Sequence, residues 1–295
     1  MRPGAYCARV FSLTRAAALA AALGMVAVGV KAQAPDLDGV LARAGDRVAE
    51  YYRRAESIVC MERVTVQPIR SDLAPEGFAR VLDYELRVDW EPSADGEAPD
   101  ANVVRELKRI NGRPARPKDE PKCMDPRAIS PEPLGFMLPH HRDEYVFSWL
   151  GAGRDRKRSV LMMSYQSRAD EHERPEVTRK DDCTSFSVPS AVKGRVWLDP
   201  TTHDILRVDQ GLKRQFEVRV PYKIVRYGEN DSFVVERLDS SIRYRPVAFH
   251  DPDEVVLLPE SIESLMVVRG DRVGNRTTQI FSDYKRFMTA GRVIR

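Results

Sequence analysis

Beyond residue 57 the chain consists of segments in which apolar and polar side chains alternate with a period of two. In the clearest of them, residues 82–90, apolar side chains at even positions are separated by charged ones (Leu82, Tyr84, Leu86, Val88 and Trp90 against Asp83, Glu85, Arg87 and Asp89). This is the pattern of a β-strand that buries one face. Because no helical segments separate such strands, we expect them to pair antiparallel, without crossover connections.

Turn sequences separate the predicted strands. Asn111-Gly112 is typical of a tight turn, and Asp199-Pro200-Thr201-Thr202 is expected to join residues 195–198 and 205–208 in a hairpin. Long strands are predicted at residues 214–227, 232–247, 255–268 and 276–288. The proline-rich residues 113–133 show no period and are interpreted as a long surface loop, followed by a short helical turn at 134–138.

One convincing amphipathic helix precedes the strands, at residues 37–57, with Asp36 as its expected N-cap. Its apolar stripe contains Leu37, Val40, Leu41, Ala44, Val48, Tyr51, Tyr52 and Ala55. The opposite side mixes both charge signs, which favours packing on a sheet over binding to a membrane. The predicted fold class is therefore mainly β (α+β), a curved antiparallel meander or half-barrel covered by an N-terminal amphipathic helix.

The first 34 residues have the pattern of a cleavable export signal. Three arginines precede an uncharged run at residues 16–30, and Ala32-Gln33-Ala34 offers small residues for cleavage. The run is shorter than the roughly 20 apolar residues that span a bilayer. We expect residues 1–34 to be a signal peptide and residues 35–295 to be a single β domain in the periplasm or outside the cell. No transmembrane span is expected after cleavage, and peripheral contact with a membrane stays open.

Removal of this segment changes the charge balance. The signal holds four of the 47 basic residues and no acidic one, which leaves 43 basic against 44 acidic residues and a formal net charge of −1. Nucleic acid is excluded as a partner because phosphate binding requires a basic surface.

Three cysteines follow the predicted cleavage site. An oxidising compartment favours one disulfide and one thiol over three thiols. Cys123 and Cys183 lie in polar, loop-like surroundings and are the favoured disulfide pair, although sequence alone does not fix the connectivity. Cys60 lies in an apolar alternating run and is interpreted as a packed core residue, with no neighbouring base that would activate it as a nucleophile.

Candidate metal and phosphate sites are weak. His140, His141, Asp143 and Glu144 match no zinc spacing, and the stretch from His250 to Glu254 lacks the pattern of a calcium loop. The basic residues Arg154, Arg156, Lys157 and Arg158 do not complete a phosphate loop and are interpreted as an exposed turn. No Gly-x-Ser-x-Gly elbow occurs. We therefore predict a protein that is not an enzyme, with no metal and no cofactor.

Aromatic side chains recur on the predicted strands. A strongly curved sheet would present many of them on its concave side, as either a filled core or an apolar pocket. The candidate ligand-binding residues are Tyr84, Trp90, Phe147, Trp149, Trp197 and Phe216.

Three short pieces carry a resemblance to a known family. The hairpin at residues 194–207, Leu258-Pro259-Glu260-Ser261-Ile262 and Phe281-Ser282-Asp283-Tyr284 resemble the outer-membrane lipoprotein-sorting superfamily. That resemblance implies that residues 35–295 form a single lipoprotein-carrier-like β domain, in which a helix covers a curved, incompletely closed antiparallel sheet with an apolar cavity for acyl chains. The stretch from Asp239 to Arg245 is also similar to uncharacterised exported bacterial proteins.

The function predicted from the sequence is that of an exported, non-catalytic cell-envelope protein that binds a lipid, a lipoprotein acyl group or another apolar ligand in its curved sheet. A first alternative is an envelope interaction or scaffold module with a packed core and contacts through residues 113–133. A second is an uncharacterised hydrolase. The oligomeric state is not predicted.

Overall fold

The computed structural model describes residues 36–55, 58–91, 100–119, 123, 125–126, 134–170, 174–180, 183–225, 230–250, 253–270 and 274–286. The predicted signal peptide and its cleavage site lie outside these residues. Within the described part of the chain, no helix is both long and apolar enough to cross a membrane.

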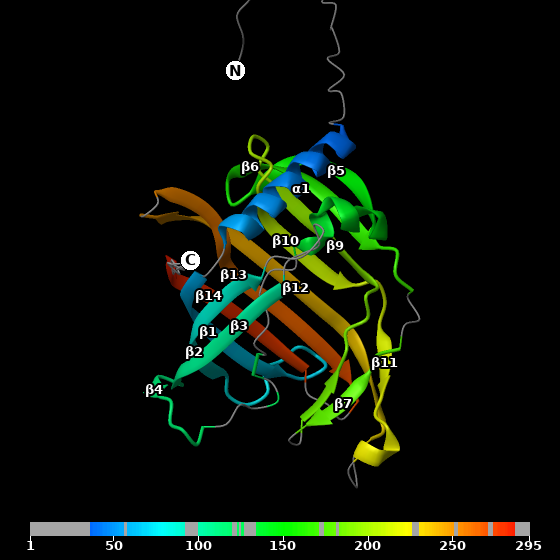
Figure 1. Ribbon diagram of the computed structural model, residues 1–295. Helices are drawn as coiled ribbons and strands as arrows, with labels where there is room; N and C mark the ends of the chain where they lie inside the picture. The colour runs from blue at the N-terminus through cyan, green and yellow to red at the C-terminus, as the bar shows by residue number, and fades with distance from the viewer. Residues whose placement is uncertain are drawn as a thin grey trace, which may run out of the picture. The chain divides into compact units, whose positions relative to one another are not determined.

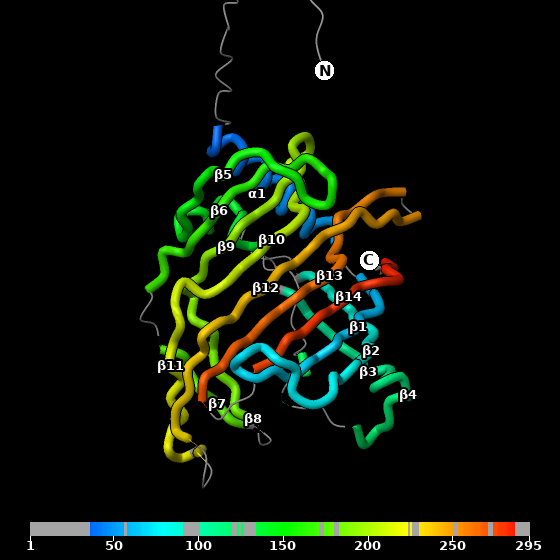
Figure 2. The backbone as a smooth tube through the Cα atoms, turned by 180° about the vertical axis from the view of Figure 1, so that it is seen from behind, coloured from blue at the N-terminus to red at the C-terminus, as the bar shows by residue number. Residues whose placement is uncertain are grey.

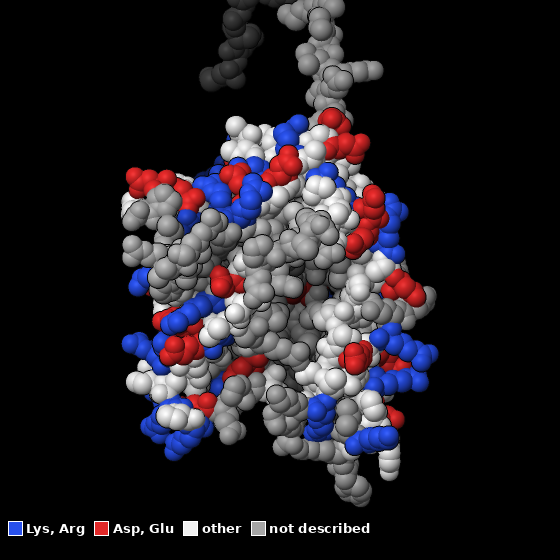
Figure 3. All heavy atoms as spheres, viewed as in Figure 1, with Lys and Arg blue, Asp and Glu red and all other residues white. Residues whose placement is uncertain are grey.

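The helix α1 (Leu37–Arg54) lies across one face of the sheet and ends three residues before its predicted end (Figure 1). Its buried residues follow the predicted stripe (Val40, Leu41, Ala44, Gly45, Val48, Tyr51 and Tyr52). Asp36 is the N-cap residue, as predicted, and its backbone oxygen accepts the first helical hydrogen bond from the Val40 N–H at 3.0 Å, but its side chain makes no capping hydrogen bond. Basic and acidic side chains intermingle around α1 in Figure 3, as the mixed polar side predicts.

Antiparallel strands make up most of the described residues. They are β1 (Ile58–Ile69), β2 (Arg80–Glu91), β3 (Asp100–Ile110), β4 (Arg113–Pro114), β5 (Tyr145–Asp155), β6 (Arg158–Ser167), β7 (Val177–Lys180), β8 (Cys183–Phe186), β9 (Val192–Leu198), β10 (Ile205–Leu212), β11 (Phe216–Arg219), β12 (Ser232–Phe249), β13 (Glu254–Arg269) and β14 (Gly274–Arg286). The described residues also form the short 3₁₀ helices η2 (Gly135–Met137), η3 (Pro139–Glu144) and η4 (Tyr222–Ile224).

Twelve strands form one sheet in the order β4-β3-β2-β1-β14-β13-β12-β10-β9-β6-β5, with β11 paired to β12 beside this path. β7 and β8 form a separate two-stranded sheet. The large sheet curves without closing, since β4 and β5 lie at opposite ends of the order (Figures 1 and 2). The predicted fold class, an open curved antiparallel sheet covered by the N-terminal helix, is confirmed.

Apart from β7, β8 and β11, which lie off the main path, the strand order departs from a simple meander where β1 meets β14. The first long strand pairs with the last, from Ile58 opposite Arg286 to Ile69 opposite Gly274. The chain therefore leaves the sheet at β4 and re-enters it at the opposite end with β5. This pairing places the start and the end of the domain side by side in the middle of the sheet.

Two predicted turns are confirmed and one predicted strand is wrong. Asn111 and Gly112 both have positive φ, 49° and 81°, and the 195–198 and 205–208 segments pair as a hairpin. The long strand expected at residues 214–227 is only four residues, Phe216–Arg219, followed by η4. Pro221, just after the strand, has no backbone N–H to donate to a neighbouring strand.

Candidate functional site

The two faces of the large sheet are distinguished by what covers them. Neighbouring residues in register point to the same face, and consecutive residues on a strand to opposite faces. We call the face that packs against α1 the inner face and the other the outer face. The inner face carries the main apolar cluster, to which β1, β2, β6, β9, β10, β12, β13 and β14 all contribute buried side chains together with α1 and η2.

Aromatic rings fix the two covering segments to the inner face. The Tyr52 ring of α1 meets the Trp90 ring edge-on, with 5.0 Å between centroids. The Phe136 ring of η2 stacks on the Tyr165 ring, with 4.4 Å between centroids, and its centroid lies 6.4 Å from that of Phe147. The short helical turn predicted at residues 134–138 therefore closes the end of the inner face that α1 leaves open near β5.

Directly beneath α1 the apolar space is filled, whereas a separate pocket of about 180 Å³ lies along one side of the helix, between Arg47, Arg54 and the 199–204 turn. The pocket lined by Tyr51, Trp90 and Phe281 holds about 20 Å³, room for no more than a single water. Cys60, which also lines it, is 3% exposed and forms no disulfide, as predicted for a packed core residue. Of the two alternatives left open by the sequence, a filled core is the one found beneath α1.

The six candidate ligand residues do not form one group. Trp90, Phe147 and Trp149 belong to the inner apolar cluster beneath the two covers. Tyr84 lies on the same face in a smaller cluster with Val64 and Val66. Trp197 and Phe216 belong to two other clusters.

Trp197 belongs to the outer face, because the preceding Val196 points into the inner cluster. The Arg207 guanidinium lies over its ring, 4.4 Å from the centroid. Phe216 packs with Phe186 and Phe233 in a cluster at the far end of β12. An alternating pattern assigns side chains to faces within one strand but does not say which face of each strand is the covered one.

A buried polar row, which the sequence reasoning missed, separates the two inner clusters. Glu62 on β1 is fully buried and accepts hydrogen bonds from Arg105 at 2.7 and 3.0 Å and from Gln279 at 3.0 Å. Burial raises the pKa of Glu62 above its usual value, and Arg105 opposes that shift. Glu62 occupies a position that the alternation of β1 predicts to be buried. A charged residue at such a position is the sequence feature that could have indicated the buried polar row.

The Tyr84 ring lies beside this row, with the Arg105 guanidinium 5.5 Å from its centroid. Burial, and secondly the charge of Asp125, raise the pKa of Tyr84 to about 12. The Tyr84 phenol therefore stays neutral at any physiological pH.

Polar contacts hold α1 along both sides. On one side Arg47 pairs with Asp204 at 2.6 Å, and Arg54 with Glu254 at 3.0 Å. On the other side Arg142 of η3 donates to the Leu41 backbone oxygen at 2.7 Å. The helix is therefore clamped between the 199–204 turn and the segment that carries η2 and η3.

His203 adds a titratable contact to this clamp. Arg43 Nε donates to His203 Nε2 at 3.1 Å. Partial burial, and secondly the Arg43 charge, lower the pKa of His203 below 6.5. The imidazole accepts this hydrogen bond only while that nitrogen is unprotonated.

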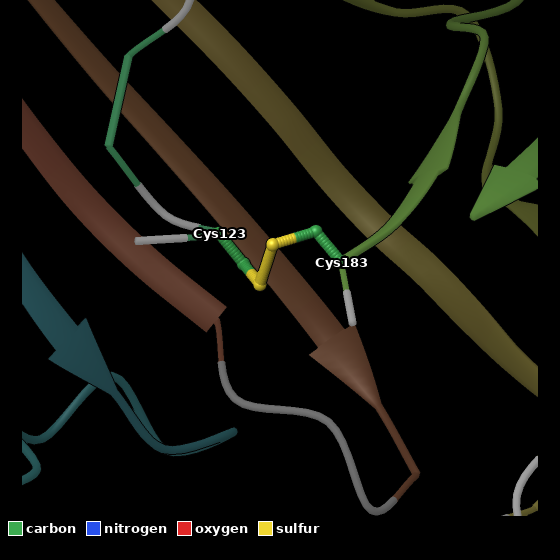
Figure 4. Close-up of a disulfide and its surroundings, with 2 residues drawn as sticks. All are labelled: Cys123 and Cys183. Carbon is green, nitrogen blue, oxygen red and sulfur yellow. A yellow bond between two sulfur atoms is a disulfide. The ribbon is translucent and has the colours of Figure 1, made fainter. Parts of the chain in front are cut away.

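The favoured disulfide is confirmed. Cys123 and Cys183 are bonded, with their Cα atoms 5.2 Å apart and 60 positions between them in sequence (Figure 4). Two residues further on, Asp125 receives hydrogen bonds from Arg80 at 2.9 and 2.8 Å, and its side chain is 4% exposed. The segment interpreted as a surface loop is therefore anchored at both points, to β8 and to β2.

The weak metal candidates are not brought together. His141 lies on η3 and contacts Glu144 at 2.7 Å, while His250 contacts Asp253 at 3.4 Å. Positions 251 and 252 lie outside the described residues. Within the described part of the chain, no group of three or more His, Cys, Asp or Glu side chains is arranged to hold a metal ion.

A hollow of about 960 Å³ lies on the outer face, and most of the residues that line it are polar. It includes side chains of β5, β6, β9, β10, β12, β13 and β14. Ser241, for example, lines it, and the next residue, Ile242, belongs to the inner cluster.

Comparisons with solved structures give three instructive matches. An outer membrane lipoprotein-sorting protein domain from Vibrio parahaemolyticus is 11% identical, with 86% of this chain and 94% of that chain covered and a TM-score of 0.41. A LolA superfamily protein from Nitrosomonas europaea is 10% identical, with 85% and 93% covered and a TM-score of 0.33. A DUF1329 family protein from Desulfovibrio piger is 9% identical, with 85% and 93% covered and a TM-score of 0.37.

Two of these proteins are named for the superfamily that the sequence resembles. Similarity at this level assigns no family, ligand or partner to this chain. No family model matches the sequence, and no curated protein matches it.

Proposed function

We propose that this chain is an exported, non-catalytic binding protein of the cell envelope that accepts an amphiphilic ligand, such as a lipid or a lipoprotein acyl group, on the inner face of its sheet. The ligand would contact Trp90, Phe147 and Trp149, with Tyr84 further along the same face. Export to the periplasm or beyond is supported by the Cys123–Cys183 disulfide, because oxidising compartments are where such bonds persist.

The observation that carries the proposal is the form of the inner face. One continuous apolar surface spans eight strands, and among the described residues a single helix and one short 3₁₀ segment cover it. With only about 20 Å³ beneath α1, ligand entry requires α1 or the η2–η3 segment to move aside. The polar contacts on α1 are ion pairs and one side-chain-to-backbone bond, which open at low cost. The apolar stripe of α1 is also buried, so the ligand would have to replace the apolar contacts that the helix gives up.

The three tryptophans provide a test that distinguishes the two faces. In a Trp197→Phe variant only Trp90 and Trp149, on the inner face, fluoresce; in a Trp90→Phe/Trp149→Phe variant only Trp197, on the outer face, does. A brominated fatty acid is expected to quench the first variant and leave the second unchanged. Equal quenching of both, or quenching of neither, would contradict an inner-face ligand site.

The Arg142 contact provides a matched perturbation. Arg142→Ala removes the hydrogen bond to Leu41 and should make uptake of the brominated probe faster. Arg109→Ala, an exposed arginine on β3 distant from α1, is the control and should leave the rate unchanged. Lipid identified by mass spectrometry after mild purification would name the natural ligand.

The filled space beneath α1 favours a second candidate, an envelope interaction module that keeps a packed core. Its partner would be contacted through the 113–133 segment, where Arg116 and Lys118 are exposed. Crosslinking in the envelope should then capture a protein that is lost with Arg116→Glu/Lys118→Glu, while the brominated probe quenches no tryptophan. Capture that is unaffected by these substitutions would contradict this candidate.

A further inference from the structure

The outer-face hollow is built from side chains that meet strand by strand. Figure 2 views the sheet from behind, with α1 on its far side. One row across the hollow consists of register neighbours on six adjacent strands, namely Ser148, Ser164, Arg195, Asp209, Ser241 and Glu263. At about 4.8 Å between strands, this row is roughly 24 Å long, which suits an extended ligand better than a compact one.

Small side chains account for the depth of the hollow. Three of the six residues in the row are serines, and Gly211 on the neighbouring row has no side chain. A Cβ at Gly211 would lie 2.8 Å from the Asp239 carboxylate, so the floor is tightly built there. Hydroxyl groups that both donate and accept hydrogen bonds therefore line the centre.

Two of the three acidic side chains that line the hollow form ion pairs with arginines on their own strands. Asp209 receives two hydrogen bonds of 2.7 Å from Arg207, and Asp239 pairs with Arg237. Both arginines lie two residues before their partners on the same strand. These carboxylates are consequently not available to balance the remaining positive charges.

Three basic side chains that line the hollow have no acidic partner among the described residues. Among the residues that the structure describes, Lys193, Arg195 and Arg276 make no ion pair and no side-chain hydrogen bond, and all three are exposed. The one acidic lining residue in the same situation is Glu263. The unpaired charge in the hollow is therefore net positive.

We propose that this hollow is a second binding site, on the face opposite to α1, for an extended polysaccharide that carries carboxylate groups. Guanidinium groups bind carboxylates through paired hydrogen bonds, and the serine hydroxyls match the hydroxyl groups of sugar rings. The surface of a bilayer is a poorer match, since it is flat and the lining residues lie in a depression. The site is independent of the ligand proposed for the inner face.

Polygalacturonate, with neutral dextran as its control, is the probe that tests this site by isothermal titration calorimetry. The protein is expected to bind polygalacturonate, more weakly as salt is raised, and not to bind dextran. Arg195→Glu/Arg276→Glu should weaken binding on the order of tenfold or more. Arg109→Glu is the matched control, because Arg109 is exposed and lies in register with Asp83 at the other end of the sheet, outside the hollow.

Unchanged binding in Arg195→Glu/Arg276→Glu, or equal loss in Arg109→Glu, would overturn the proposal. So would binding to phosphatidylglycerol vesicles or to poly-glutamate with none to polygalacturonate, since that assigns the charge to another class of partner. Quenching by the brominated fatty acid in the Trp197→Phe background should be the same with and without the two outer-face substitutions. Failure of one site is thereby separated from failure of the other.

Discussion

Glu62 and Arg105 form a buried ion pair across β2, with guanidinium nitrogens 2.7 and 3.0 Å from the two carboxylate oxygens and 0% and 4% of the side chains exposed. Gln279 from β14 donates a third hydrogen bond, so one carboxylate joins β3, β1 and β14, with the bond to β3 reaching across β2. Removing one partner of such a pair strongly destabilises the fold, because the other charge is then buried away from water without an opposite charge beside it.

We expect Arg105→Met and Glu62→Leu each to lower the free energy of unfolding by about 3–5 kcal/mol, since each leaves one buried charge without its partner. The double variant should lose much less than the sum. Urea denaturation of all four proteins gives the coupling energy. Additive losses would mean that the two groups do not act as a pair.

Loss of the disulfide should destabilise the protein by about 4 kcal/mol according to the chain-entropy relation for a loop of this length. The measurement is the urea midpoint of Cys123→Ser/Cys183→Ser compared with that of the unchanged protein. Treating the unchanged protein with a reductant should reproduce the variant's midpoint, while the variant itself should not respond. A reductant effect that persists in the variant would implicate another site.

The 199–204 turn depends on the Asp199 side chain, which accepts hydrogen bonds from the Thr201 and Thr202 amides at 2.9 and 3.1 Å. Partial burial acts to raise the pKa of Asp199, but these amides and Arg158 outweigh it, so the pKa lies below 3.8. The stabilisation is thus present above pH 3.8 and lost as the pH falls through the folded-state value.

Asp199→Ala should therefore cost about 1–2 kcal/mol at neutral pH. Asp199→Asn keeps an acceptor oxygen and should cost less, with no loss attributable to this position in acid. Thermal melts between pH 7 and pH 3 compare the three proteins. An acid-dependent loss of equal size in Asp199→Asn would assign the effect to another carboxyl group.

His203 should titrate below 6.5 in the folded protein because of partial burial and the nearby Arg43. The unfolded chain takes up the proton first, so stability contributed here is complete above about pH 6.5 and declines as the pH falls toward the folded-state pKa. Two-dimensional NMR of the imidazole measures that pKa directly. In Arg43→Met it should move upward; no movement would show that Arg43 does not act on the ring.

Local features of this chain were predictable where neighbouring residues decide them. The alternation in β2 and the Asn111-Gly112 turn depend on a few consecutive side chains and their backbone preferences. The Cys123–Cys183 bond followed from the chemistry of three thiols once one of them was assigned to an apolar run. The end of α1 and the length of β11 were missed, because element boundaries depend on packing contacts and on Pro221 ending the pairing.

The candidate site was only partly predictable, because it depends on contacts between residues that are far apart in the sequence. Trp90 and Trp197 have equally good strand patterns, yet one faces α1 and the other faces away from it. Glu62 is hydrogen-bonded to Arg105, 43 positions later in the sequence, and to Gln279, 217 positions later. Local sequence patterns do not predict contacts over such separations. The outer-face hollow brings together side chains from seven strands in the same way.

By itself the sequence determined that this chain forms one amphipathic helix followed by antiparallel strands, since periodicity and turn residues act within a few positions. Only the tertiary structure decided that β1 pairs with β14, which face of each strand α1 covers, and that the space beneath it is filled. These outcomes are set by the total burial of apolar surface and the pairing of buried charges, which are sums over contacts between residues far apart in the chain.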